Sequence, residues 1–172
     1  MQPFERILQG GDRRSIGNSN QVVAQVLRQP ARFAELIHCL WSPEPVVRMR
    51  AADAAEKVSL TQPHLLAPFQ PELFALAAQT KQPELRWHLA LMIPRLRLSA
   101  SQRDAIADVF RMYLDDRSSL VKTCALQALF DLSRGSPDAE TEVGALLERV
   151  CRTGTPAMKA RARNLLKQLG GR

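Results

Sequence analysis

Four stretches of the sequence align without gaps, and they decide the fold. They are VVRMRAADAAEKV (46–58), ELRWHLALMIPRL (84–96), LVKTCALQALFDL (120–132) and AMKARARNLLKQL (157–169). Their second residues, Val47, Leu85, Val121 and Met158, are 38, 36 and 37 positions apart. Apolar residues recur 4, 7, 8 and 11 positions after each of these anchors, which is one face of an α-helix. The pattern predicts four equivalent helices in a repeat.

Each of these helices follows another stretch with a helical pattern. The four upstream stretches are ARFAELIHCL (31–40), PELFALAAQ (71–79), SQRDAIADVFRMYL (101–114) and AETEVGALLERVC (139–151). Thr155 before Pro156 is typical of an N-cap and a first helical residue, and Ser101 with Asp104 predicts a capping box. Units of two helices with a period of about 37 residues indicate an α-solenoid.

The segments VVRMRAADAAEKV and SLVKTCALQALFDL (119–132) resemble HEAT repeats, with a Val-Arg-x-x-Ala-x-x-Ala type of core in the second helix. The resemblance covers about 31–169, and the whole chain is similar to small bacterial HEAT-repeat proteins that have no assigned activity. It implies an all-α, right-handed α–α superhelix with repeats near 31–60, 66–98, 101–133 and 138–169. It carries over no catalytic residues.

The first 30 residues precede these repeats. QVVAQVLR (21–28) predicts a helix capped by Asn20, which would be half of a degenerate first repeat that covers the open end of the stack. GGDRRSIGNSN (10–20) is typical of a loop. We therefore predict one HEAT-like domain over 1–172, in which 1–30 form an N-terminal cap and loop.

A basic residue follows each anchor, namely Arg48, Arg86, Lys122 and Lys159. These positions lie at the seam between repeats, so we expect them to bond backbone carbonyls or turn oxygens. HEAT units often have Asp six residues earlier, in the turn between the two helices. Only Asp116 is found there, because the other repeats have Ser42, Thr80 and Thr153.

Composition narrows the class of protein. No apolar run reaches the roughly 20 residues that span a bilayer, and the N-terminus lacks the apolar core of a signal peptide. The cysteines, Cys39, Cys124 and Cys151, form no CxxC pair, and their odd number suits a reducing compartment. We expect a cytoplasmic protein without membrane contact.

The positive charge is confined to one end of the chain. The formal net charge is +7. The stretch from Arg149 to Arg172 contains seven basic residues, and the sequence has no Asp or Glu after Glu148. On the last predicted helix, Lys159, Arg163 and Lys167 recur at a spacing of four residues, and no further repeat covers them. The stripe predicts either a solubilising cap for the end of the solenoid or an anion-binding site.

The outward positions of the second helices predict a binding surface. These helices usually line the concave groove of a HEAT stack, yet a helical wheel places Trp87, Leu91, Pro94 and Phe130 on that side. Exposed apolar residues around a Trp are typical of protein-binding hot spots. The alternative is internal packing, because Pro94 lacks the N–H that would bond to Ala90 and so kinks its helix. The predicted groove comprises Met49, Arg50, Trp87, His88, Leu91, Arg95 and Phe130.

The sequence lacks the motifs of common enzymes. It has no Gly-rich phosphate loop, no Gly-x-Ser-x-Gly, no His-Glu-x-x-His and no ligand spacing among its three histidines. We predict a non-enzymatic protein-binding scaffold without cofactor or metal. The partner is another protein, and a second copy of the chain could also fill the groove.

Two other functions stay open. One is nucleic-acid binding through the C-terminal basic helix, although Asp53, Glu56 and Leu91 interrupt a continuous basic track. The other is an enzyme with the architecture of the HEAT-like alkylpurine DNA glycosylases, in which Asp53 and Trp87 would lie over a flipped base.

Overall fold

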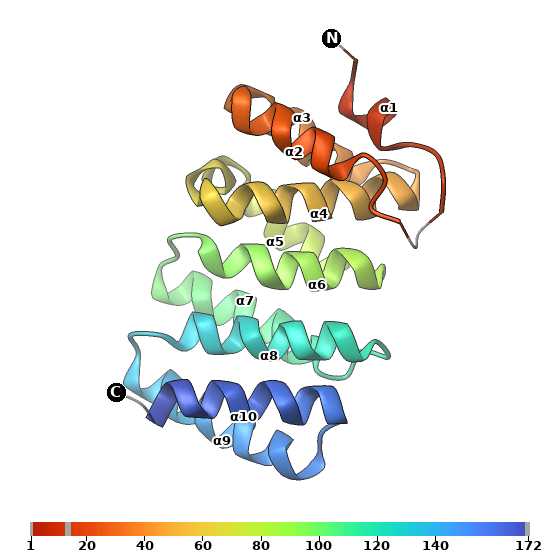
Figure 1. The fold of residues 1–172 in the computed structure, drawn as a ribbon. Helices are drawn as coiled ribbons and strands as arrows, with labels where there is room; N and C mark the ends of the chain where they lie inside the picture. The colour runs from red at the N-terminus through yellow and green to blue at the C-terminus, as the bar shows by residue number, and fades with distance from the viewer. Residues whose placement is uncertain (1, 13–14, 171–172) are drawn as a thin grey trace. The chain divides into compact units, whose positions relative to one another are not determined.

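The computed structural model describes residues 2–12 and 15–170, and in this part of the chain every regular element is a helix (Figure 1). The chain divides into two compact units, Met1–Leu96 and Arg97–Arg172. The boundary falls two residues before the end of the second predicted repeat, which spans 66–98. The prediction of a single domain stays a prediction.

Unit 1 is built of short helix pairs. In chain order its α-helices are α1 (Phe4–Leu8), α2 (Ser19–Arg28), α3 (Phe33–His38), α4 (Pro45–Thr61), α5 (Gln70–Gln79) and α6 (Pro83–Met92). Its 3₁₀ helices are η1 (Pro30–Arg32), η2 (Cys39–Trp41), η3 (Pro63–Phe69) and η4 (Ile93–Arg95). α4 packs between α2 and α6 in one layer, and α3 and α5 form a second layer behind them (Figure 1). α2 thus takes the place of a second helix in a repeat before the first, as predicted for a degenerate repeat.

Unit 2 contains two longer helix pairs. They are α7 (Ala100–Tyr113) with α8 (Ser119–Ser133), and α9 (Pro137–Thr153) with α10 (Pro156–Gly170). α8 and α10 lie side by side, while α7 and α9 form the layer behind (Figure 1). Each unit by itself has the all-helical, paired arrangement of an α-solenoid.

The core follows the repeated apolar face. The four anchors are buried, and so are the residues four positions later, Ala51, Leu89, Ala125 and Ala162. Three of these four are alanines, which allow neighbouring helices to approach closely. Full burial of a large aliphatic side chain contributes about 1.5–3 kcal/mol, so the repeat sustains a continuous core along each unit.

Three local predictions can be compared with the observed helix ends. Met158 N donates to Thr155 Oγ1 at 3.4 Å, which confirms the cap of α10. The predicted capping box of α7 is wrong, because Ser99 forms it with Gln102: Gln102 N donates to Ser99 Oγ at 3.3 Å and Ser99 N to Gln102 Oε1 at 2.9 Å. α2 begins at Ser19, one residue before the predicted cap at Asn20.

Pro94 ends α6 as an α-helix. The helix stops at Met92 and continues as the 3₁₀ helix η4, because Pro94 has no N–H for the next α-helical bond. The change of helix type re-aims Arg95, whose guanidinium reaches back to α4.

Candidate functional site

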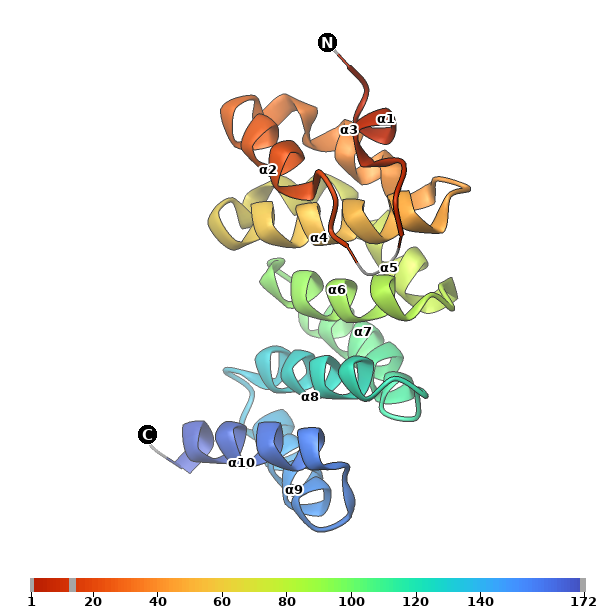
Figure 2. The ribbon, with the colours of Figure 1, turned by 45° about the vertical axis from the view of Figure 1, so that its right-hand side comes forward.

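The segment between α1 and α2, described for residues 9–12 and 15–18 and called the N-terminal segment below, lies across α4 and is held there by Arg50. Nη1, Nη2 and Nε of Arg50 donate to the carbonyl oxygens of Leu8, Asp12 and Ser15 at 2.8, 3.2 and 3.1 Å. In Figure 2 the described parts of this segment, residues 9–12 after α1 and 15–18 before α2, pass in front of α4. Gly17 comes so close that a Cβ there would be 2.6 Å from Arg50 Cζ. The prediction that Arg50 lies on an open polar rim is therefore wrong, since the chain itself covers it and leaves it 3% exposed.

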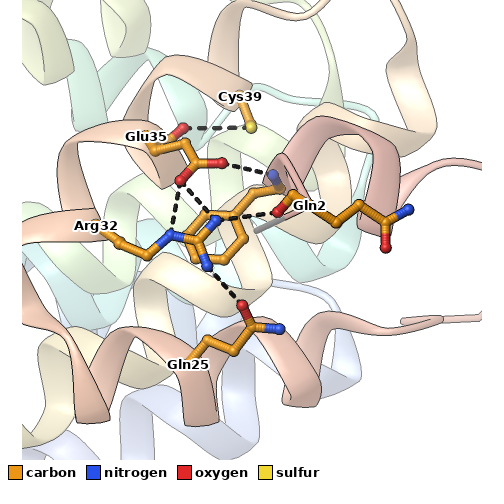
Figure 3. Close-up of polar contacts among 6 residues, drawn as sticks. Gln2, Gln25, Arg32, Glu35 and Cys39 are labelled. Atoms are coloured by element: carbon orange, nitrogen blue, oxygen red, sulfur yellow. Dashed lines mark hydrogen bonds and ion pairs between the residues drawn. The ribbon is translucent and has the colours of Figure 1, made fainter.

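The cap at the start of unit 1 is joined by a cluster around Arg32 and Glu35 (Figure 3). Arg32 pairs with Glu35 Oε2 at 2.7 Å and donates to Gln25 Oε1 at 2.6 Å, which links α2 to α3. Glu35 Oε1 accepts from Phe4 N at 2.7 Å, and the Arg32 guanidinium lies 3.7 Å from the Phe4 ring centroid. α1, α2 and α3 are thereby fixed to one another.

Cys39 belongs to the same cluster. Its thiol donates to the Glu35 carbonyl oxygen at 3.3 Å (Figure 3). Burial, with smaller contributions from Glu5 and Glu35, raises the pKa of Cys39 to about 12. The side chain is therefore a neutral thiol at pH 7 and a poor nucleophile.

Asp53 connects α4 to α2. Ser19 Oγ donates to Asp53 Oδ2, which also pairs with Lys57 Nζ at 2.7 Å. Lys57 Nζ donates in turn to Asn20 Oδ1 at 2.9 Å. The alternative of a glycosylase-like enzyme needed Asp53 to lie over a flipped base, whereas the structure buries this carboxylate in contacts within the helix layer.

Arg95 connects η4 to α4 in a similar way. Its Nη1 donates to the Glu56 carbonyl oxygen at 2.6 Å and to Ser59 Oγ, and its Nη2 forms an ion pair with Glu56 Oε1. Arg95 was predicted to be a rim residue, whereas the structure commits it to internal contacts. α2, α4 and α6 with its η4 extension are therefore joined into one layer by polar side chains.

Arg48 and Arg86, the basic residues that follow two of the anchors, bond carbonyl oxygens of the turn between paired helices, as predicted. Arg48 Nη1 donates to the Ser42 carbonyl oxygen at 2.7 Å, and Arg86 Nε to that of Thr80 at 2.9 Å. The acceptor lies six residues before the arginine in both repeats. Arg48 Nε also donates to Gln82 Oε1 at 2.8 Å, which joins the turn of one repeat to the next.

Of the predicted apolar groove residues, Trp87 and Leu91 on α6 stay partly exposed. The Trp87 ring lies 5.6 Å from the His88 ring, at an interplanar angle of 54°. Met49 and Phe130 are 7% and 2% exposed, so the prediction that they offer groove surface is wrong. The reason is geometric, since a second helix such as α4 or α8 packs against a neighbouring second helix as well as its own partner. Such a helix therefore buries a wider arc of its surface than a helical wheel of one isolated helix assigns to the core.

His88 is buried as well, and its Nδ1 has no hydrogen-bond partner among the described residues. Burial lowers the pKa of His88, against the opposing fields of Asp53, Glu56 and Glu84, with Lys57 adding to the decrease. Its imidazole is therefore neutral at pH 7. The predicted rim role of His88 is wrong, because the ring faces the inside of the helix layer.

The C-terminal stripe lies on the outer flank of α10. Arg163 and Lys167 are exposed and Lys159 is half-buried, and none of the three belongs to an ion pair found among residues 2–12 and 15–170. Arg161 Nη1 donates to Gln127 Oε1 of α8 at 3.0 Å. Arg163 is two residues further on, more than half a turn round the helix, so it points away from α8.

The sequence did not predict a cleft in unit 2. It lies between α7 and α9, over α8, and encloses about 310 Å³. Its apolar lining consists of Leu114, Leu129, Val143 and Leu146. The periodicity of the sequence shows which face of a helix is apolar, but not how far apart two helices lie.

No group of at least three His, Cys, Asp or Glu side chains in 2–12 and 15–170 is placed to hold a metal ion. Within the same residues, no helix has the length and apolar character needed to cross a bilayer.

The stacked helix pairs define the class of protein, an α-solenoid. The family model of the HEAT repeat domain matches residues 10–169, and the chain belongs to the HEAT-repeat family. Comparison with curated proteins and with solved structures found no match.

Proposed function

We propose that the chain is a non-enzymatic scaffold that binds a partner protein through α6, in the layer formed by α2, α4 and α6. The observation that carries the proposal is the partial exposure of Trp87 and Leu91, on a layer in which charged side chains such as Lys57 and Arg95 bond to neighbours within it. Trp is enriched among residues that dominate binding energy. Trp87 and Leu91 lie on a formed helix, so binding does not require this backbone to be ordered first, which favours affinity.

The N-terminal segment restricts where a partner can contact this layer. It lies over α4 through the carbonyl contacts of Arg50, so the face of α4 around Arg50 is occupied by the chain itself. A partner therefore contacts α6, where Trp87 and Leu91 lie one turn apart. The contact is smaller than the predicted groove of seven residues.

His88 and the three cysteines support the proposed absence of catalysis and the proposed cytoplasmic location. His88 is buried and neutral, and the Cys39 thiol stays protonated, so neither provides a nucleophile or a general base on an open surface. Cys39, Cys124 and Cys151 form no disulfide in the described part of the chain, which suits a reducing compartment. The scaffold needs no cofactor.

The test compares two tryptophans. Trp87→Ala is expected to abolish capture of a specific protein from lysate, as measured by quantitative mass spectrometry. Trp41→Ala is the matched control, because Trp41 lies on η2 at 47% exposure and outside the α6 face. The proposal fails if both variants retain the same proteins as the wild type, or if only Trp41→Ala loses one. Light scattering on the purified chain identifies the case in which the partner is a second copy.

The second candidate is polyanion binding by α10. It is favoured by the exposed Arg163 and Lys167, which no acid neutralises among the described ion pairs. Phosphate contacts release counterions, so binding of a labelled single-stranded or duplex oligonucleotide should weaken steeply with salt. Arg163→Gln with Lys167→Gln should reduce binding and flatten the salt dependence. The control is Arg97→Gln with Arg117→Gln, which removes the same charge from exposed positions elsewhere in unit 2. An equal loss of oligonucleotide binding in both double variants would mean that binding depends only on the net charge of the chain.

A further inference from the structure

The cleft between α7 and α9 has the lining of a binding site. Leu114, Leu129, Val143 and Leu146 surround its volume of about 310 Å³. Ligand-binding pockets of proteins begin at roughly 300 Å³, and this one has room for one or two apolar side chains. It lies entirely within unit 2 and is separate from the α6 surface.

Two arginines give the same cleft a positive rim. Arg149 is exposed and belongs to none of the ion pairs found in the described part of the chain. Arg111 pairs with Asp108 on its own helix at 2.6 Å and with Glu142 across the cleft at 3.4 Å. The Arg111 and Glu142 side chains are 49% and 71% exposed, and pairs this exposed are weak. An incoming carboxylate can therefore replace Glu142 on Arg111 while it also contacts Arg149.

A second cavity of about 190 Å³ continues the cleft toward the beginning of both helices. It shares Arg111, Leu129, Glu142 and Val143 with the first, and its outer walls carry Asp104 and Asp138. The trench thus has acidic residues at one end and Arg149 at the other, with apolar side chains and the exposed Arg111–Glu142 pair between them. A ligand that lies along it is oriented by this charge order.

We propose that the trench between α7 and α9 binds an amphipathic segment of a partner protein. The segment places an apolar side chain against Leu129 and Leu146 and a carboxylate on Arg149 and Arg111. Its other end carries a basic side chain toward Asp138 and Asp104. Charge complementarity at both ends and the apolar middle distinguish this occupant from an uncharged lipid chain and from nucleic acid, whose backbone would meet the acidic end.

The probe is a fluorescein-labelled, acetylated peptide of about four helical turns, with Lys near one end, two leucines one turn apart in the middle and Glu near the other end. Fluorescence anisotropy should give saturable binding to the full chain. Arg149→Glu should weaken this binding by about tenfold, since it replaces a charge-assisted contact with repulsion. A peptide with Lys in place of its Glu should bind Arg149→Glu better than it binds the wild type.

Arg152→Glu is the matched control, because Arg152 is exposed on the same helix, makes the same change in net charge and does not line either cavity. It should leave the affinity within about twofold of the wild type. Leu146→Gln should also weaken binding while circular dichroism and melting stay unchanged.

Three results would overturn the proposal. The first is the absence of saturable binding. The second is equal loss in Arg149→Glu and Arg152→Glu, which would reflect general electrostatics. The third is a dimeric wild type that Arg149→Glu converts to monomers, which would mean that a second copy fills the trench. The Trp87 experiment is unaffected by any of these outcomes, so the two proposals fail separately.

Discussion

Arg50→Ala tests whether one buried side chain holds the N-terminal segment on α4. Arg50 is 3% exposed and donates to the carbonyl oxygens of Leu8, Gln9, Gly10, Asp12 and Ser15. Alanine removes all of these donors at once. We expect the segment before α2 to detach while the helix layer itself stays folded.

The magnitude follows from the number of donor atoms. Three guanidinium nitrogens each hold at least one carbonyl, and the closest partners of the three are within 3.2 Å. A bond to a charged donor contributes about 1.5–3 kcal/mol, but the released carbonyls regain water, so about 1 kcal/mol for each nitrogen is appropriate. The free energy of unfolding should fall by about 3 kcal/mol. For a chain of this size the melting temperature should fall by roughly 6–12 °C. Arg50→Lys should lose about half as much, because a single ammonium cannot reach the same set of carbonyls.

The assay is calorimetric melting together with amide hydrogen exchange. Exchange should rise in the segment before α2 and stay unchanged in α7 to α10. The reasoning is refuted if Arg50→Ala melts within about 2 °C of the wild type and exchange before α2 is unaltered.

Gly17→Ala tests the same contact between the N-terminal segment and Arg50 in a second way. Gly17 has φ of +51°, which costs an alanine about 1–2 kcal/mol in the wild-type background. A Cβ there would also meet Arg50 Nε at 2.8 Å. In the Arg50→Ala background the segment is detached, so Gly17→Ala meets neither the collision nor the backbone cost. The two substitutions should therefore be non-additive, and strict additivity in a double-mutant cycle would contradict the close approach.

Three further predictions concern side chains within unit 1. Burial lowers the pKa of His88 below 6.5, so the unfolded chain binds this proton more tightly than the folded chain. The free energy of unfolding should therefore decrease as pH falls through about 6.5. Urea unfolding at two pH values should show a smaller decrease for His88→Gln than for the wild type. Cys39, with a pKa of about 12, should react with a thiol reagent far more slowly than half-buried Cys151, and equal rates in the folded chain would contradict its burial. Arg95→Met should cost about 2–3 kcal/mol in thermal unfolding, because Glu56 is left largely buried without its partner, and a loss below about 0.5 kcal/mol would show that the pair is solvated.

Periodic features of the chain were predictable because they depend on positions one or two helical turns apart. The spacing of the anchors identified the four second helices, and the position of Arg48 and Arg86 relative to the turns foretold their carbonyl contacts. The N-cap at Thr155 was predictable for the same reason, since the cap and the group it satisfies are three residues apart.

The binding surfaces were not predictable in this way. Arg50 was read as a rim residue, yet its partners lie 35 to 42 residues away in the chain. Arg95 likewise reaches Glu56 across 39 residues, and only after η4 has changed its direction. Phe130 is buried because α8 packs against more than one neighbour, which a single-helix wheel does not include.

The sequence by itself determined that this protein is a stack of HEAT-type helix pairs, because an apolar face that recurs with the period of the helix can be satisfied only by burial against a similar face. The tertiary structure alone decided which outward side chains stay accessible and where a cleft opens. Those properties depend on distances between segments far apart in the chain, such as the N-terminal segment over α4 and the space between α7 and α9. No local period encodes such distances.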